Sequence, residues 1–227
     1  MINAKRKIKI LFRWNGYNLY SLSALTGLLS DRLDPAGFDV KLSDTKEDLL
    51  KEIRDTASPI VAAYSFCSPQ YSLTKQEIKT LRETAGGKVK IICGGPHASA
   101  LPETVLEAGA DAVFTGEAEE SLPDFLNRLR ENPGAVKEKI IPPLPLKDFD
   151  TYPPFSDRSG LITPLEMRRG CGVKCSFCQT PRIFKNIRER SIEYAKKYAK
   201  IIKKTRKRFH LFPHARRSIL RRGRRER

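Results

Sequence analysis

Three cysteines on one short segment are the residues whose types and spacing best suit chemistry. Cys171, Cys175 and Cys178 follow the pattern Cys-x3-Cys-x2-Cys. Three thiolates on one loop can each bind a different iron of a cubane 4Fe-4S cluster, and the neighbouring glycines allow the backbone to turn tightly around it. Three protein ligands leave one iron open. The amino and carboxylate groups of S-adenosylmethionine could chelate such an open iron.

Two other interpretations of these cysteines remain open. A structural zinc knuckle would need a fourth Cys or His close by, but the next such residue along the chain is His210. Buried, unreactive thiols are the second alternative, and the basic residues Arg168, Arg169 and Lys174 make that segment a poor core. We favour the iron-sulfur interpretation.

The first 130 residues alternate apolar, β-branched runs with segments of helical period. This alternation predicts βαβ units around a doubly wound, flavodoxin-like or Rossmann-like parallel sheet in residues 1–132. Ligands of such sheets bind at the carboxyl ends of the strands. The strands are expected at 8–12, 38–42, 60–64, 89–93 and 111–114, and the helices at 19–32, 46–55, 73–84, 102–107 and 121–130.

The pattern changes after residue 132. Residues 133–160 are predicted to be a linker, because six prolines lie between Pro133 and Pro154. A strand at 161–167, the cysteine loop and a helix from about 192 to 203 then predict the first unit of a second α/β domain, at 161–205.

The cysteine loop resembles the cluster loop of the radical S-adenosylmethionine superfamily, including the aromatic Phe177 before the third cysteine. The resemblance implies a (β/α)6 partial barrel whose first strand precedes the loop. It also implies reductive cleavage of S-adenosylmethionine to a 5′-deoxyadenosyl radical, with an electron from an external donor such as ferredoxin or flavodoxin. Phe177 would then line the adenine side of the S-adenosylmethionine site.

Residues 94–122 resemble the second half of the cobalamin-binding domain that precedes the barrel in one branch of that superfamily. The resemblance implies cobalamin contacts from Ser65, Gly94 and Gly95. The motif Asp-x-His-x-x-Gly, which carries the lower cobalt ligand, is absent, and residues 13–18 offer no imidazole at its place. Either cobalamin binds without a histidine ligand or the domain has lost this cofactor.

Five other residues of the first domain have simpler expected roles. Cys67 and Cys93 are expected to be small buried residues at strand ends. We expect His97 to be a loop or capping residue. Glu117 and Glu119 are expected to open a helix, where carboxylates suit the helix dipole.

The net charge of +17 is concentrated at the end of the chain. Residues 203–227 contain 12 basic residues and one acid, so they carry +11, whereas the first 202 residues carry +6. Only 67 residues follow residue 160, although a (β/α)6 barrel needs roughly 200 by analogy with larger barrels. We therefore expect a truncated enzyme whose tail at 206–227 is disordered or out of frame. A native basic tail that binds nucleic acid is the alternative.

Composition and cysteine use favour a cytoplasmic protein without a membrane span, since three clustered cysteines suit a reducing compartment. The expected function is a radical S-adenosylmethionine enzyme, or a fragment of one, that acts on a small-molecule or unknown substrate. A non-catalytic cobalamin-domain fragment and a basic nucleic-acid-binding protein are the alternatives. The substrate, the reaction type and the oligomeric state do not follow from the sequence.

Overall fold

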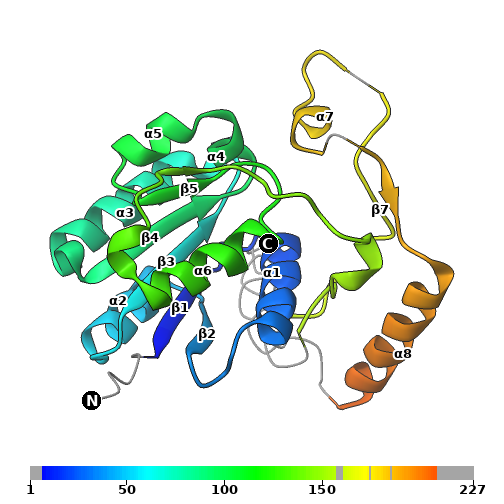
Figure 1. Ribbon diagram of the computed structural model, residues 1–227, viewed down its shortest axis with the longest axis horizontal. Helices are drawn as coiled ribbons and strands as arrows, with labels where there is room; N and C mark the ends of the chain where they lie inside the picture. The colour runs from blue at the N-terminus through cyan, green and yellow to red at the C-terminus, as the bar shows by residue number, and fades with distance from the viewer. Residues whose placement is uncertain (1–6, 157–160, 174, 185, 209–227) are drawn as a thin grey trace, which may run out of the picture.

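The computed structural model describes residues 7–156, 161–173, 175–184 and 186–208. The predicted alternation of strands and helices is present in residues 8–131 (Figure 1). The five predicted strands are β1 (Ile8–Arg13), β2 (Phe38–Ser43), β3 (Ile60–Ser65), β4 (Val89–Gly94) and β5 (Ala112–Phe114). The helices between and after them are α1 (Leu19–Arg32), α2 (Lys46–Arg54), α3 (Tyr71–Ala85), α4 (Pro96–Ala100), α5 (Pro102–Glu107) and α6 (Ser121–Glu131).

The sheet is parallel throughout and has the order β2-β1-β3-β4-β5-β6. Its winding direction reverses between β1 and β3, so it is a doubly wound, flavodoxin-like sheet as predicted. In β1, Ile10 and Phe12 pack towards α1 and α6, whereas Leu11 packs towards α2 and α3. Every residue of β3 is buried, as expected for a central strand covered on both faces.

The proline-rich segment contributes more to the fold than a linker would. Its strand β6 (Ile140–Ile141) pairs in parallel with β5 and becomes the sixth strand of the sheet. Further along, Phe149 and Tyr152 pack on Leu28 of α1. Short 3-10 turns occupy Ser68–Gln70, Gly86–Lys88, Pro133–Ala135 and Phe149–Thr151.

The prediction of a strand at 161–167 is wrong. This stretch has no strand pairing, and the strand β7 comprises only Arg168–Arg169, which pairs antiparallel with β8 (Arg188–Glu189). Pro164 lacks a backbone donor, and the stretch is held by α1, where the hydroxyl of Ser23 donates to the carbonyl of Leu161 at 2.9 Å. The cysteine loop and α7 (Thr180–Ile183) lie between β7 and β8, and α8 (Ile192–Arg208) follows.

Helix α8 confirms the last predicted helix and is anchored by two of its tyrosines. Tyr194 and Tyr198 form a small apolar cluster with Phe155, and the rings of Phe155 and Tyr198 meet edge to face at 5.5 Å between centroids. The predicted basic tail falls mostly outside the described residues. Within the described residues, no helix is both long and apolar enough to cross a membrane.

Replacing Gly27 with alanine should loosen the contact between α1 and the proline-rich segment. A Cβ atom at Gly27 would lie 2.6 Å from the carbonyl carbon of Phe155, which is backbone and cannot rotate away. Overpacking costs about 1–3 kcal/mol whereas alanine recovers about 1 kcal/mol of helix propensity, so we expect a net loss of up to about 2 kcal/mol. Chemical denaturation measures this loss. At Gly87 a Cβ would meet no atom within 4 Å, so Gly87→Ala should change stability by less than about 0.5 kcal/mol.

Candidate functional site

A cavity of about 630 Å³ lies at the carboxyl edge of the parallel sheet. Its walls come from the loops after β1, β3, β4 and β5, which is where doubly wound sheets bind ligands. Residues beyond the sheet complete it, including Thr163, Arg169 and Gln179. The cavity is therefore bounded on one side by the sheet and on the other by the segment that carries the cysteine loop.

All three residues predicted to contact cobalamin line this cavity. The hydroxyls of Ser65 and Ser21 are 3.1 Å apart. Gly95 has a φ of +93°, and a Cβ there would lie 2.8 Å from the backbone nitrogen of Phe66, so a side chain is excluded. At Gly94 such a Cβ would make an ordinary van der Waals contact with Phe114 at 3.7 Å, so a small side chain fits there.

Asn18 organises the loop after β1, and sequence reasoning missed it. Its amide nitrogen donates to the carbonyl of Arg13 at 2.9 Å and to that of Ser65 at 3.0 Å, so this buried side chain joins the ends of β1 and β3. Nearby, Tyr17 and Tyr20 are exposed at the rim of the cavity. None of the described residues that line the cavity is a histidine.

His97 is a buried core residue that does not line the cavity. Its ring stacks on Tyr71 with centroids 4.3 Å apart, and its Nδ1 lies 3.0 Å from the hydroxyl of Ser68. Burial lowers the pKa of His97 below its usual value. The expected role as a loop or capping residue is therefore wrong, because α4 carries this side chain into the core, where it packs against the rings of Phe66 and Tyr71.

Lowering the pH should destabilise the fold through His97. Because its pKa is lower in the folded state, the unfolded chain binds an extra proton as the pH falls below about 6.5. The stabilisation of the fold by the neutral His97 ring is complete above that pH and decreases below it. Denaturation of His97→Gln between about pH 7 and about pH 5 should show a shallower loss of stability than the unchanged protein. Equal slopes in the two proteins would contradict this assignment.

The two cysteines of the sheet differ from each other. Cys93 is buried as expected, and burial raises the pKa of its thiol. Cys67 is exposed, so the expectation that it is buried is wrong. It follows the end of β3 by two residues and lines the cavity, where Gln70 accepts a hydrogen bond from its backbone nitrogen at 2.9 Å.

The cysteine loop carries three free thiols. Cys171 is exposed, and Cys175 and Cys178 are half-buried. The backbone nitrogen of Cys178 donates to the carbonyl of Cys175 at 3.1 Å, and hydrogen bonds from the side chain and backbone of Thr180 lower the pKa of Cys178. Phe177 is 91% exposed and points into solvent, and it does not line the cavity. In the described part of the chain, no three His, Cys, Asp or Glu side chains are grouped closely enough to hold a metal ion.

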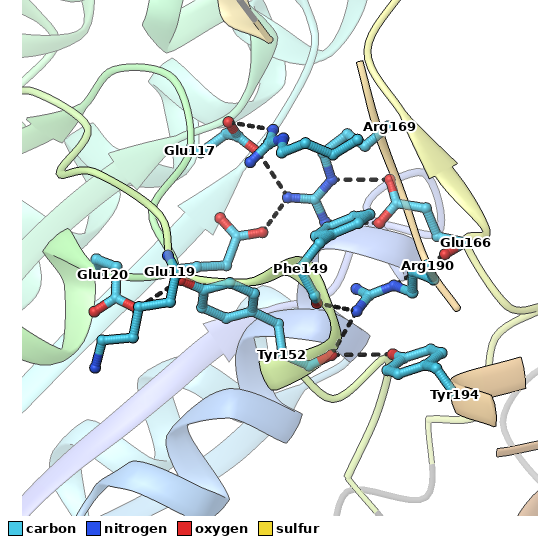
Figure 2. A network of polar contacts seen from close by, with 11 residues as sticks. Glu117, Glu119, Glu120, Phe149, Tyr152, Glu166, Arg169, Arg190 and Tyr194 are labelled. Atoms are coloured by element: carbon cyan, nitrogen blue, oxygen red, sulfur yellow. Dashed lines mark hydrogen bonds and ion pairs between the residues drawn. The ribbon is translucent and has the colours of Figure 1, made fainter. Parts of the chain in front are cut away.

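A network of charged side chains joins the segment before the cysteine loop to the loop after β5 (Figure 2). Arg169 binds Glu166 through two nitrogens at 2.9 and 2.7 Å, Glu117 at 2.9 Å, and Glu119. Arg188 also binds Glu117, at 2.5 and 2.6 Å. Burial opposes the charge of Arg169, but Glu119 and Glu166 outweigh it, so the pKa of this guanidinium is raised. The expectation that Glu117 and Glu119 open a helix is wrong. Both residues precede α6, which begins at Ser121, and their carboxylates bind arginines.

A second arginine, Arg190, ties the proline-rich segment to α8 (Figure 2). Its guanidinium donates to the carbonyl oxygens of Phe149, of Tyr152 at 3.0 Å and of Glu166 at 3.0 Å. It also lies 3.8 Å above the ring centroid of Phe149. The hydroxyl of Tyr194 donates to the same Tyr152 carbonyl at 3.0 Å. The buried Arg190 therefore connects the proline-rich segment and the stretch at 161–167 to the start of α8.

The class of the sheet domain follows from comparison with known families. Residues 21–126 match the family model described as the B12 binding domain. This range begins within α1 and ends within α6, so it includes the loops that carry Ser65, Gly94 and Gly95. This part of the chain is therefore similar to B12 binding domains.

The relatives of this chain include proteins that are named as enzymes. The ribosomal protein uS12 methylthiotransferase RimO of Gloeothece citriformis is 31% identical over 130 residues, which are 56% of this chain and 29% of that protein. A putative methylthiotransferase of Methanocaldococcus jannaschii is 30% identical over 152 residues, or 59% of this chain and 33% of the relative. The chain thus spans about a third or less of the length of these relatives.

One solved structure is also similar in sequence. It is the N-terminal domain of a hypothetical protein of Thermotoga maritima, with 34% identity, 57% of this chain and 94% of the other chain covered, and a TM-score of 0.40.

The residues at the site fit the two implied cofactors differently. Three free thiols on one glycine-containing loop are a suitable donor set for a 4Fe-4S cluster. For cobalamin, the glycines of the sheet edge allow close approach of a ligand to the backbone, but the described lining residues offer no imidazole for cobalt. Among the described residues that line this cavity, no histidine could therefore serve as the lower ligand of cobalt.

Proposed function

We propose that this chain is part of a radical S-adenosylmethionine protein in which Cys171, Cys175 and Cys178 bind a 4Fe-4S cluster. The observation that carries the proposal is the loop of three free thiols attached to the ligand-binding edge of a B12-type sheet. The named activities of the relatives, methylthiotransferases, support a transferase of methyl or methylthio groups. The substrate is a small molecule or a macromolecular side chain, and a cytoplasmic electron donor such as ferredoxin or flavodoxin is part of the proposal.

The chain's own residues have three tasks in this proposal. When bound, the cluster supplies the electron that cleaves S-adenosylmethionine to methionine and a 5′-deoxyadenosyl radical. The three thiolates leave one iron position open for the amino and carboxylate groups of that substrate. The neighbouring cavity at the sheet edge offers space for a substrate, and Phe177 remains the residue proposed to contact adenine.

Anaerobic reconstitution tests this proposal. The protein is incubated with iron and sulfide, reduced, and examined by EPR with and without S-adenosylmethionine. We expect a reduced-cluster signal that changes when S-adenosylmethionine is added, and formation of 5′-deoxyadenosine. A protein that binds zinc but no cluster would overturn the proposal. Cluster binding without cleavage would instead indicate a non-catalytic fragment.

Cobalamin binding has its own test, because the cavity lacks an imidazole. If cobalamin binds at the sheet edge, EPR of its reduced cobalt should lack coupling to a protein nitrogen. Gly94→Val should weaken that binding at least tenfold, because it would add a bulky side chain at a residue that lines the cavity. Gly87→Val, at a glycine whose Cβ would meet no atom within 4 Å, serves as the matched control. Unchanged affinity in Gly94→Val would place the cofactor elsewhere.

A further inference from the structure

We propose that Arg169, Glu117 and Gln179 are positioning residues that fix both ends of the cysteine loop to the carboxyl edge of the sheet. The inference rests on the proposed function, since it assigns these residues to the alignment of the three cluster ligands. None of them is itself proposed to bind the cluster. We call the two attachments the loop clamp, formed by Arg169 with its carboxylates at one end and by Gln179 with Pro96 at the other.

The first attachment lies two residues before Cys171. The side chain of Arg169 is only 10% exposed, and those of Glu117 and Glu119 are 11% and 8% exposed. Charges buried to this extent hold a single arrangement, because separating them would leave each without solvent or partner. Gly170 then turns the chain at a φ of +94°, where a Cβ would lie 2.5 Å from the carbonyl oxygen of Asn186. The start of the loop therefore has little freedom.

The second attachment follows directly after Cys178. The side-chain nitrogen of Gln179 donates to the carbonyl oxygen of Pro96 at 2.6 Å. Pro96 begins α4, immediately after the Gly94-Gly95 pair that ends β4. The start of the loop is thus bound to the segment after β5, and its end to the turn after the neighbouring strand β4. Arg169 and Glu117 are 52 residues apart in sequence, and Gln179 and Pro96 are 83 residues apart.

Glu117 is the central member of the clamp because it binds two arginines. It accepts from Arg169 on β7 and from Arg188 on β8, the two strands between which the loop extends. Three carboxylates, those of Glu117, Glu119 and Glu166, face these two guanidinium groups, so the network carries one net negative charge. Glu117→Gln removes this excess negative charge, so two carboxylates then face two guanidinium groups. The variant also weakens the contacts of residue 117 with both arginines.

Amide hydrogen exchange of the cluster-free protein tests the clamp without any cofactor. In Glu117→Gln and in Gln179→Ala, exchange of residues 170–183 should become roughly tenfold faster, since the first variant weakens one attachment of the loop and the second removes the other. Glu138→Gln is the matched control, because it changes a Glu–Arg pair on the surface, with Arg128 at 2.9 Å, far from the loop in sequence. Exchange in that peptide should not change in the control. Unchanged exchange in both clamp variants would overturn the proposal.

The reduction potential of the reconstituted cluster separates positioning from simple stability. We expect Glu117→Gln to shift the potential and the EPR line shape, whereas Glu138→Gln and the destabilised Gly27→Ala, which both lie outside the clamp, should leave both unchanged. Arg169→Lys, which keeps the charge but loses the two-nitrogen contact with Glu166, should give an intermediate shift. Identical potentials in all variants would show that the clamp does not position the ligands. If even the unchanged protein fails to bind a cluster, the proposed function fails, whereas the exchange experiment still decides whether the clamp exists.

Discussion

Replacing Cys175 with alanine should reduce iron and sulfide binding to near zero. A cubane held by three thiolates on one loop loses a corner ligand in this variant, and the two remaining cysteines offer too few donors to retain it. Cys171→Ala and Cys178→Ala should behave in the same way. Iron and sulfide content after anaerobic reconstitution, together with the visible absorption of the cluster, measures the effect.

Cys67→Ala is the control for these variants. Cys67 is also a free thiol near the cavity, but it lies outside the loop and follows β3. Cluster content should therefore remain at the level of the unchanged protein. A cluster that survives in Cys175→Ala but disappears in Cys67→Ala would contradict the assignment of the ligands.

Removal of the Arg190 side chain should be among the most destabilising single changes in the described part of the chain. Arg190 is only 7% exposed and donates to the carbonyl oxygens of Phe149, Tyr152 and Glu166. In Arg190→Ala these oxygens lose their buried donor, and the rings of Phe149 and Tyr194 lose the guanidinium packed against them. We expect a loss of about 3–5 kcal/mol, measured by chemical denaturation.

Arg168→Ala provides the comparison for Arg190. The side chain of Arg168 is 59% exposed and forms a 3.6 Å ion pair with Glu189 at the surface. Such a pair contributes about 0–1 kcal/mol, so this variant should remain close to the unchanged protein in stability. Similar losses in the two variants would show that the buried contacts of Arg190 do not determine its effect.

The elements of the sheet domain were predictable because each has a local signal. The apolar spacing of residues 19–32 and the proline at 102 gave the bounds of α1 and α5, and β-branched runs gave the strands. The rule for doubly wound sheets also pointed to the carboxyl edge, where the structure has a cavity lined by Ser65, Gly94 and Gly95. Local pattern and strand topology were sufficient for these features.

Contacts between distant segments could not be predicted in this way. The pairing of Arg169 with Glu117 joins residues 52 apart, and a glutamate before a helix has the same local appearance whether it binds an arginine or only faces the helix end. The apolar stretch at 161–167 was assigned to a strand because its composition suits one, but strand formation also requires a neighbour. In the structure this stretch lies against Ser23 of α1.

Strand β6 determines where a shortened form of this protein could be cut. The backbone nitrogen of Val113 donates to Lys139 at 2.7 Å, and that of Thr115 donates to Ile141 at 2.9 Å. A recombinant fragment ending at residue 132 would leave these donors on an open edge, and open edges recruit strands from other molecules. Such a fragment should self-associate and precipitate, whereas one ending at residue 156 keeps the edge covered. The smallest soluble unit of the sheet therefore extends through the proline-rich segment.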